Sequence, residues 1–217
     1  MGTATMYSER LTAGFEWASR LHATQQRKGV DTPYLSHLLG VASLAIEYDG
    51  DEDDVIAGML HDAVEDCGGL PMLEKIRTKF GNTVASTVEQ CSDSVTVDAD
   101  AKSDWVDRKR AYVASVAGKS ERARFVTTCD KIHNATAILN DHRAGRAADG
   151  TTVWDRLGGK EPEQVVAYYS AMVAALKGRV KEPLWQRLAD TVTALEAVAK
   201  TDGHAHWLAE LQRPLGA

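Results

Sequence analysis

The chain has 217 residues, of which 44% are hydrophobic and 26% are charged, and its formal net charge is −6. These values fit one globular domain, and the acidic balance argues against a broad nucleic-acid-binding surface. No apolar run approaches the roughly 18 residues of a membrane span, and MGTATMYSER lacks the apolar core of a signal peptide, so we expect no membrane segment. The three scattered cysteines form neither a disulfide framework nor a Cys-x-x-Cys site, which favours a cytoplasmic location.

Apolar residues at helical spacing, separated by turn residues, predict a series of helices. Leu11, Phe15, Ala18 and Leu21 indicate a first helix over about 8–26, and Pro33 suits the first turn of the next. Further helices are predicted, in chain order, over about 55–66, 70–81, 82–93, 103–116, 121–141, 161–180 and 183–200, with polar loops at 95–103 and 143–152 and a short tail around 204–211. The β-branched clusters are short and lack hairpin turns, so the predicted fold class is all-α.

Four polar residues follow the apolar run VIAGML: His61, Asp62, Glu65 and Asp66. On a continuous helix, His61 and Asp62 are about 100° apart, and the two acids lie one turn further along. The four side chains would then share one broad face. A neighbouring His and Asp can give a divalent cation one nitrogen and one oxygen, with Glu65 and Asp66 near a bound water. The alternative is a solvated helix end with an acidic tail.

Two further residues fit the same chemistry. His37 stands among apolar neighbours near a helix start, where it is either a satisfied core residue or a metal ligand. Asp130 stands in the apolar middle of FVTTCDKIHNATAIL, where burial is costly unless the carboxylate is paired in a salt bridge or bound to a metal. Together with His61 and Asp62 they supply two imidazoles and two carboxylates, a set that suits Mn²⁺, Fe²⁺ or Zn²⁺.

The sequence resembles the HD superfamily of metal phosphohydrolases. Within that superfamily it is most similar to the hydrolase domains of RelA/SpoT homologues and to the stand-alone small alarmone hydrolases. The resemblance runs from about residue 8 to about residue 180. The motifs that carry it are A18-x-x-x-H22, R27-K28, T32-P33-Y34-x-x-H37, G58-M-L-H61-D62-x-V-E65-D66, F80-G81, W105-x-x-R108-K109-x-x-Y112 and D130-K131-x-H133-N134.

The resemblance implies an HD-domain bundle of about eight to ten helices over residues 1–182, with 183–217 as a helical extension packed on it. It implies a divalent metal, Mn²⁺ first, and removal of the 3′-pyrophosphate of (p)ppGpp or (p)ppApp. The implied roles are metal ligation by His37, His61, Asp62 and Asp130, catalysis by Glu65 and Asp66, and substrate binding by Arg27, Lys28, Asn134 and Tyr168.

Three positions depart from the family pattern. Leu38 replaces a common Pro, the stretch from Arg27-Lys28 to His37 is about one residue shorter than usual, and Thr136 replaces an Arg that helps hold phosphates. The loop W154-D155-R156 and Lys160 are candidates for replacement cations. Two alternatives therefore stay open. One is an HD phosphatase of another nucleotide, such as NADPH or a nucleoside monophosphate, and the other is a nucleotide-binding HD module without turnover. Nucleotide is the expected partner, and the oligomeric state is open.

Other polar residues are assigned no catalytic role. The run Arg108-Lys109-Arg110 is expected to be a solvated helix face, and His22 is expected to be structural. Tyr168 fits the core as well as it fits a nucleotide contact.

Overall fold

The computed structural model describes residues 7–93, 104–145, 150–157 and 161–204. In these ranges the fold is all-α, as predicted, and the only β-type pairing is an isolated bridge between Gln26 and Pro33. The α-helices are α1 (Glu9–Leu21), α2 (Leu35–Glu47), α3 (Glu52–Leu60), α4 (Ala63–Cys67), α5 (Gly69–Phe80), α6 (Asn82–Cys91), α7 (Trp105–Ser115), α8 (Glu121–Ala144), α9 (Pro162–Leu176) and α10 (Glu182–Thr201). Two short 3₁₀ turns, η1 (Val116–Gly118) and η2 (Trp154–Arg156), join them. The predicted loop at 95–103, the residue Lys160 and the tail beyond residue 204 lie outside the described ranges.

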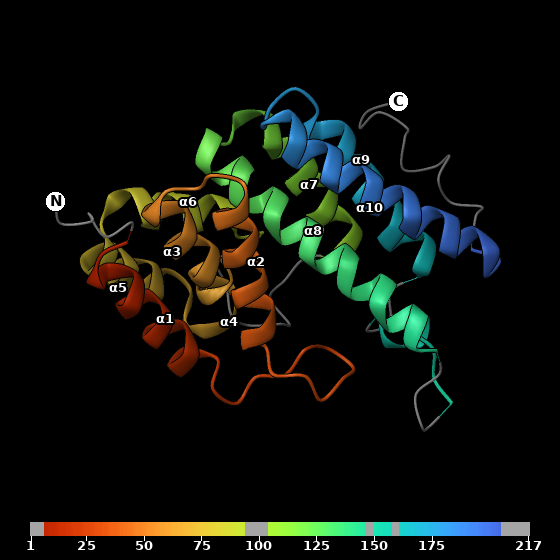
Figure 1. Ribbon diagram of the computed structural model, residues 1–217, viewed down its shortest axis with the longest axis horizontal. Coiled ribbons are helices and arrows are strands. Elements are labelled where there is room, and N and C mark those ends of the chain that lie inside the picture. The colour runs from red at the N-terminus through yellow and green to blue at the C-terminus, as the bar shows by residue number, and fades with distance from the viewer. Residues whose placement is uncertain (1–6, 94–103, 146–149, 158–160, 205–217) are drawn as a thin grey trace, which may run out of the picture.

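The long helix α8 organises the molecule. It packs against α2, α3 and α6 on one side and against α9 and α10 on the other. Figure 1 shows α1–α6 gathered at one end of the molecule and α10 running alongside α8 at the other. Because both groups of helices cover it, α8 buries even its polar residues Asp130 and Lys131. The middle of α8 is therefore where a functional site can be enclosed.

Local sequence signals explain several helix ends. Asp51 caps α3 and forms a reciprocal capping box with Asp54, and the hydroxyl of Ser120 caps α8. Gly81 separates α5 from α6 with φ of +92°, a conformation that favours glycine. These signals place the helices close to their predicted ranges.

The first helix is shorter than predicted. It ends at Leu21, not near residue 26, because the following residues form a closed loop. In that loop the amide of Arg27 donates to the carbonyl of Thr32, and the amide of Tyr34 donates to the carbonyl of Gln25. The loop brings Arg27 and Lys28 back beside the start of α2, which begins at Leu35 after the predicted Pro33 turn.

The C-terminal helix α10 packs on α8 and α9 through an apolar stripe that includes Leu184, Leu188, Val192 and Leu195. The division at residue 182 stays a prediction. Within the described ranges, no helix is both long enough and apolar enough to span a membrane.

Candidate metal centre and substrate cavity

The pair His61-Asp62 lies at a break between two helices. The prediction of one continuous helix across 55–66 is wrong, since α3 ends at Leu60 and α4 begins at Ala63. The imidazole Nδ1–H of His61 donates to the carbonyl of Gly58 at 2.8 Å, and Asp62 adopts φ −95° and ψ −5°, outside ideal helical geometry. A carbonyl oxygen can only accept, so this bond fixes the proton on Nδ1 and leaves Nε2 as a lone-pair donor. The break turns the Asp62 carboxylate toward that same nitrogen.

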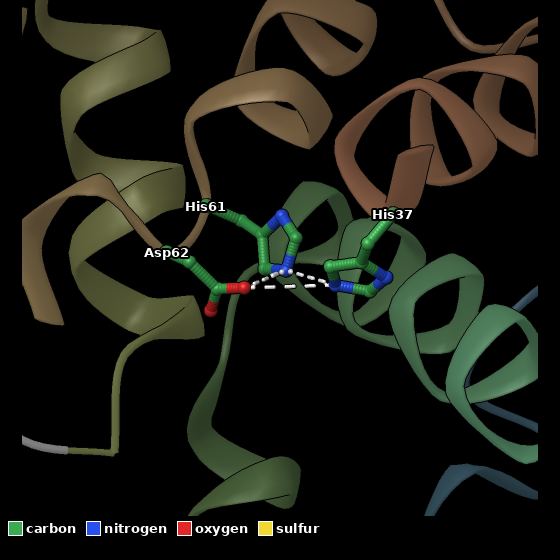
Figure 2. A group of neighbouring side chains, drawn as sticks. All are labelled: His37, His61 and Asp62. Atoms are coloured by element: carbon green, nitrogen blue, oxygen red, sulfur yellow. Dashed lines mark hydrogen bonds and ion pairs between the residues drawn. The ribbon is translucent and has the colours of Figure 1, made fainter. Parts of the chain in front are cut away.

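Four side-chain atoms from three segments, namely α2, the α3–α4 break and α8, converge here: His37 Nε2, His61 Nε2, Asp62 Oδ2 and Asp130 Oδ1. The His61 nitrogen lies 2.9 Å from Asp62 and 3.6 Å from Asp130, and the His37 nitrogen lies 3.6 Å and 3.3 Å from the same carboxylates. The two imidazole nitrogens are 3.3 Å apart. Figure 2 shows His37, His61 and Asp62 pointing at one another.

This arrangement fits a divalent cation. Ligand atoms bound about 2.1 Å from a cation lie about 3 to 3.5 Å from each other. The imidazole-to-imidazole and imidazole-to-carboxylate distances here, 2.9 to 3.6 Å, are close to that range. Two nitrogens and two carboxylate oxygens also match the donors that Mn²⁺, Fe²⁺ and Zn²⁺ accept. The four residues predicted as ligands are thus brought together by the fold, with His37 and His61 fully enclosed and Asp130 6% exposed.

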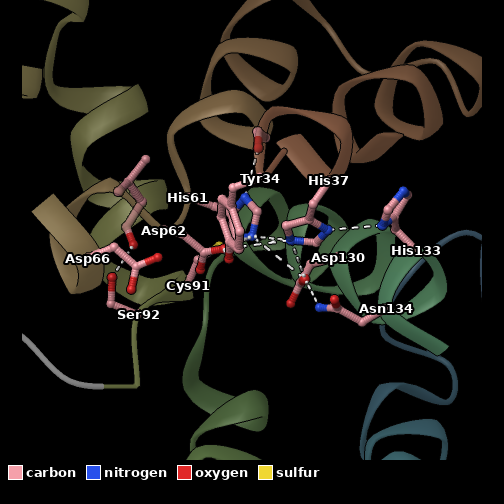
Figure 3. Close-up of polar contacts among 12 residues, drawn as sticks. Tyr34, His37, His61, Asp62, Asp66, Cys91, Ser92, Asp130, His133 and Asn134 are labelled. Atoms are coloured by element: carbon pink, nitrogen blue, oxygen red, sulfur yellow. Dashed lines mark hydrogen bonds and ion pairs between the residues drawn. The ribbon is translucent and has the colours of Figure 1, made fainter. Parts of the chain in front are cut away.

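A second layer of hydrogen bonds orients these four side chains (Figure 3). His133 Nδ1 lies 2.9 Å from His37 Nδ1, on the face of the ring away from the centre. The Tyr34 hydroxyl donates to Asp62 Oδ2 at 2.5 Å. Asp130 accepts from Lys131 on one oxygen and from Asn134 on the other. Such partners set the orientation and tautomer of metal ligands.

The electrostatics keep the carboxylates ionised. Burial alone raises the pKa of Asp62 and of Asp130, but neighbouring His61 and Lys131 outweigh burial and hold both pKa values well below the usual range. Burial lowers the pKa of His61, yet Asp62 and Asp130 outweigh it, and the pKa of His61 is well above its ordinary value. A proton and a cation therefore compete for His61 Nε2.

The acidic pair Glu65 and Asp66 lies on α4, one turn beyond Asp62. Both line a polar cavity of about 170 Å³ that also borders Asp62 and Asp130. Asp66 is exposed and accepts from the side-chain amide Nε2 of Gln25 at 2.8 Å. Carboxylates in this position can reach a water that approaches the metal centre.

A larger cavity of about 700 Å³ adjoins the first, and Asn134, Lys131, Lys109, Tyr34 and Glu65 line both. All four predicted substrate residues line it: Arg27, Lys28, Asn134 and Tyr168. The Arg27 guanidinium donates to the side-chain oxygen Oδ1 of Asn134 at 2.9 Å and lies 5.9 Å from the centre of the Tyr34 ring. The cavity therefore offers cationic and aromatic groups next to the metal centre, as a phosphorylated nucleotide requires.

The structure corrects one expectation and supports another. Arg108 and Lys109 do not lie on a solvated face: both line the larger cavity, and Lys109 pairs with the enclosed carboxylate of Asp93 at 2.5 Å. His22 is buried, lies 2.6 Å from Gln25 Oε1 and stacks on Tyr34, so its expected structural role stands.

Two residues that contact the predicted ligands, Tyr34 and His133, have no individual role in the sequence analysis. Both enter it only as members of motifs. The close approach of His133 depends on Gly40 in α2, since a Cβ there would lie 2.0 Å from the imidazole Cδ2. The glycine in the α2 sequence SHLLG was the available signal for that contact.

Comparison with known proteins gives the family. A family model described as "HD domain" matches residues 14–163. Human guanosine-3′,5′-bis(diphosphate) 3′-pyrophosphohydrolase MESH1 is 33% identical over 128 residues, which cover 58% of this chain and 67% of that protein. In Xenopus tropicalis MESH1 the matched share of the relative is 63%, so the chain spans about two thirds of these curated relatives.

A cyanobacterial relative and a solved structure are also similar to this chain. A probable guanosine-3′,5′-bis(diphosphate) 3′-pyrophosphohydrolase of Synechocystis is 34% identical over 130 residues, which cover 57% of this chain and 16% of that protein. The solved structure of a metazoan ortholog of SpoT, described as hydrolysing ppGpp, matches with a TM-score of 0.69 and 23% identity, over 93% of this chain and 99% of the other. At that identity the match shows the fold.

Proposed function

The chain belongs to the HD-domain family, and we propose that it is a metal-dependent hydrolase that removes the 3′-pyrophosphate of (p)ppGpp or (p)ppApp. The observation that carries the proposal is the convergence of two imidazoles and two carboxylates at a cavity lined by cations. The names of the MESH1 relatives point to the same substrate class.

We propose that His37, His61, Asp62 and Asp130 hold the cation, and that the cation is Mn²⁺. When bound, a divalent cation lowers the pKa of a coordinated water and offsets charge that develops on phosphorus. The hydrogen bond that His61 Nδ1 donates to the Gly58 carbonyl, and the contact between His37 Nδ1 and His133 Nδ1, keep the two imidazoles oriented toward the centre, which limits reorganisation on binding.

Glu65 and Asp66 are proposed to supply the acid–base chemistry. One carboxylate orients or deprotonates the attacking water, and the other can return a proton to the leaving oxygen. Help of this kind is typically worth about 10²- to 10⁴-fold in rate. Their mutual repulsion, and their repulsion of a polyanionic substrate, would be unfavourable in a module that only binds a nucleotide. The pair thus favours an enzyme over the binding-module alternative.

The cations of the larger cavity are proposed to position the substrate. Arg27 can stack its planar guanidinium on a purine, whereas Lys28 and Lys109 can meet phosphates as point charges. Asn134 bonds both to Asp130 and to Arg27, and so links the metal centre with the base-binding side. Tyr168 is buried, and its hydroxyl has no hydrogen-bond partner among the described residues, so it can donate to a bound ligand.

One observation keeps a second substrate under consideration. Thr136 lines the cavity at the position where the family commonly presents an Arg to phosphates. The cavity therefore has one cation fewer to bind a substrate that carries phosphates at both ends. This favours, as an alternative, an HD phosphatase that acts on NADPH or a nucleoside monophosphate. The three free cysteines accord with a proposed cytoplasmic location.

Product analysis tests the proposal. Mn²⁺-loaded protein is incubated with ppGpp, ppApp, NADPH and a set of nucleoside monophosphates, alongside Glu65→Ala. Pyrophosphate from ppGpp or ppApp, lost in the variant, supports the proposal and ranks the two bases. Inorganic phosphate from NADPH or a monophosphate, with no pyrophosphate from either alarmone, would replace it by the alternative. Nucleotide binding without any release from metal-loaded protein would favour the binding module.

A further inference from the structure

The larger cavity reaches well beyond the metal centre, along α8. Its lining includes Asn134 near the centre and Asp141 near the C-terminal end of the helix. At 1.5 Å per residue, Asp141 lies roughly 16 Å along the axis from Asp130. The wall at that far end includes the η2 turn, whose last residue, Arg156, also lines the cavity.

The Arg156 guanidinium is unpaired within the part of the chain that the structure describes. Its Nε is buried without a hydrogen-bond partner, and its side chain forms no ion pair among the described residues, although Asp141 lines the same end. Buried donors are normally satisfied, so this N–H calls for an acceptor that enters the cavity. The stem of Arg156 lies against Gly29 in the Arg27-Lys28 loop, where a Cβ would come within 2.8 Å of Arg156 Cβ.

The η2 turn is fixed by the end of α10. The Trp154 indole N–H donates to Asp202 Oδ2 at 2.6 Å, and His142 at the end of α8 bonds to the same oxygen at 2.9 Å. The Trp154 ring also meets the edge of His204 at 5.4 Å between centroids. Because Trp154 and Arg156 belong to the same 3₁₀ turn, the contacts of Trp154 help to position the Arg156 guanidinium.

We infer that Arg156 binds the substrate's 5′-phosphates, and that α10 positions it through the Asp202–Trp154 hydrogen bond. The inference rests on the proposed function, in which the metal centre takes the 3′-pyrophosphate. The opposite end of the nucleotide then reaches the far end of the cavity. A guanidinium fork matches two phosphate oxygens, and among the described residues the Arg156 fork is paired with no carboxylate.

The test compares two substrates that differ only at the 5′ end: ppGpp and guanosine 3′-diphosphate with a free 5′-hydroxyl. Loss of a charge-assisted contact in Arg156→Gln should raise KM for ppGpp roughly tenfold. KM for the 5′-hydroxyl substrate should stay within about twofold of the wild type, because the lost partner is absent from it. Arg156→Lys, which keeps the charge without the fork, should fall between the two. Arg187→Gln, at an exposed position of α10, is the matched control and should change neither KM.

The positioning role has its own test. Trp154→Phe keeps a ring but removes the N–H, and it should raise KM for ppGpp severalfold while leaving the 5′-hydroxyl substrate unaffected. Added to Arg156→Gln, it should cause no further loss, since both changes act through one contact. The control is Trp185→Phe, which removes an indole bond of 2.9 Å to the carbonyl of Val173, outside the cavity lining. An equal rise in KM for both substrates in Arg156→Gln, or no rise for either, would overturn the inference.

Failure of the proposed function is distinguishable from failure of this inference. If the wild type releases no pyrophosphate, the proposed function falls, and equilibrium binding of the same two nucleotides then decides about Arg156. Weaker binding of ppGpp, but not of the 5′-hydroxyl nucleotide, by Arg156→Gln would support the contact. If the wild type and Arg156→Gln bind each nucleotide with the same affinity, the inference is overturned. Thermal melts verify that each variant is folded.

Discussion

Substituting Gly40 with alanine should weaken metal binding, although residue 40 is not itself a ligand. An added Cβ would lie 2.0 Å from Cδ2 and 2.2 Å from Nε2 of His133, far inside van der Waals contact. The imidazole must move, and the 2.9 Å contact between His133 and His37 is then lost. When Nε2 of His37 binds the cation, the ring proton lies on Nδ1, and Nδ1 of His133 can accept it.

The size of the effect follows from what such a partner contributes. Loss of a hydrogen bond behind a metal ligand typically costs about 10- to 100-fold in metal affinity or activity. We therefore expect Gly40→Ala to raise the Mn²⁺ dissociation constant by about that factor, which corresponds to about 1.4 to 2.8 kcal/mol. Titration of metal-stripped protein with Mn²⁺ by calorimetry measures it directly.

The matched control is Gly58→Ala. Gly58 also lies inside a helix, but a Cβ there meets its nearest atom, Val41 Cγ1, at an ordinary 3.4 Å. Both alanines gain about 0.5 to 1 kcal/mol of helix propensity, so only the clash differs. His133→Ala alone should weaken binding to a similar extent, and adding Gly40→Ala to it should cost nothing more, because the ring that clashes is gone. Wild-type Mn²⁺ affinity in Gly40→Ala would refute the reasoning.

Three other changes test the electrostatics of the fold. Mn²⁺ at about 100 times its dissociation constant should stabilise the protein by about 2.7 kcal/mol, which corresponds to a rise in Tm of about 5 to 10 °C in a calorimetric scan. His61→Ala should abolish this rise. An equal rise in His61→Ala would exclude the site. Burial lowers the pKa of Lys119 to about 8, so charging it opposes folding below that pH. Denaturant titrations should show Lys119→Met more stable than wild type near pH 7.5, with the gap closing by roughly 2 kcal/mol towards pH 10, and a constant gap would contradict the assignment. The hydrogen bond from Arg122 lowers the pKa of Asp51 to about 2. The stabilisation that this pair contributes is therefore complete above about pH 4 and is lost as the pH falls towards 2. Arg122→Gln should lose about 1 kcal/mol or less at pH 7, since both groups are partly exposed, and the loss should shrink in acid; a loss that grows in acid would be inconsistent with the pairing.

The helices and the ligand set could be predicted because both rest on local patterns. Apolar spacing located α5, α6 and α8 to within a few residues, and the rarity of polar residues in apolar helices drew attention to His37 and Asp130. The break at His61-Asp62 could not be foreseen, because it depends on a side-chain bond to the Gly58 carbonyl that competes with helix continuation.

Tertiary pairing explains the remaining differences. Lys109 looks solvated in a basic run, and only the fold brings the Asp93 carboxylate to it. The contact between His133 and His37 requires a glycine on a neighbouring helix, which periodicity alone does not connect to the site. The role of α10 likewise depends on Asp202 reaching Trp154 across 48 positions of the chain.

The most direct measurement of the central claim is a titration of metal-stripped protein with Mn²⁺, in which bound metal and pyrophosphate release from ppGpp are followed together. The account predicts that both rise in parallel and saturate at one metal per chain, and that His61→Ala and Asp130→Asn lose both. Pyrophosphate release that persists without bound metal, or in a variant that no longer binds it, would contradict the account.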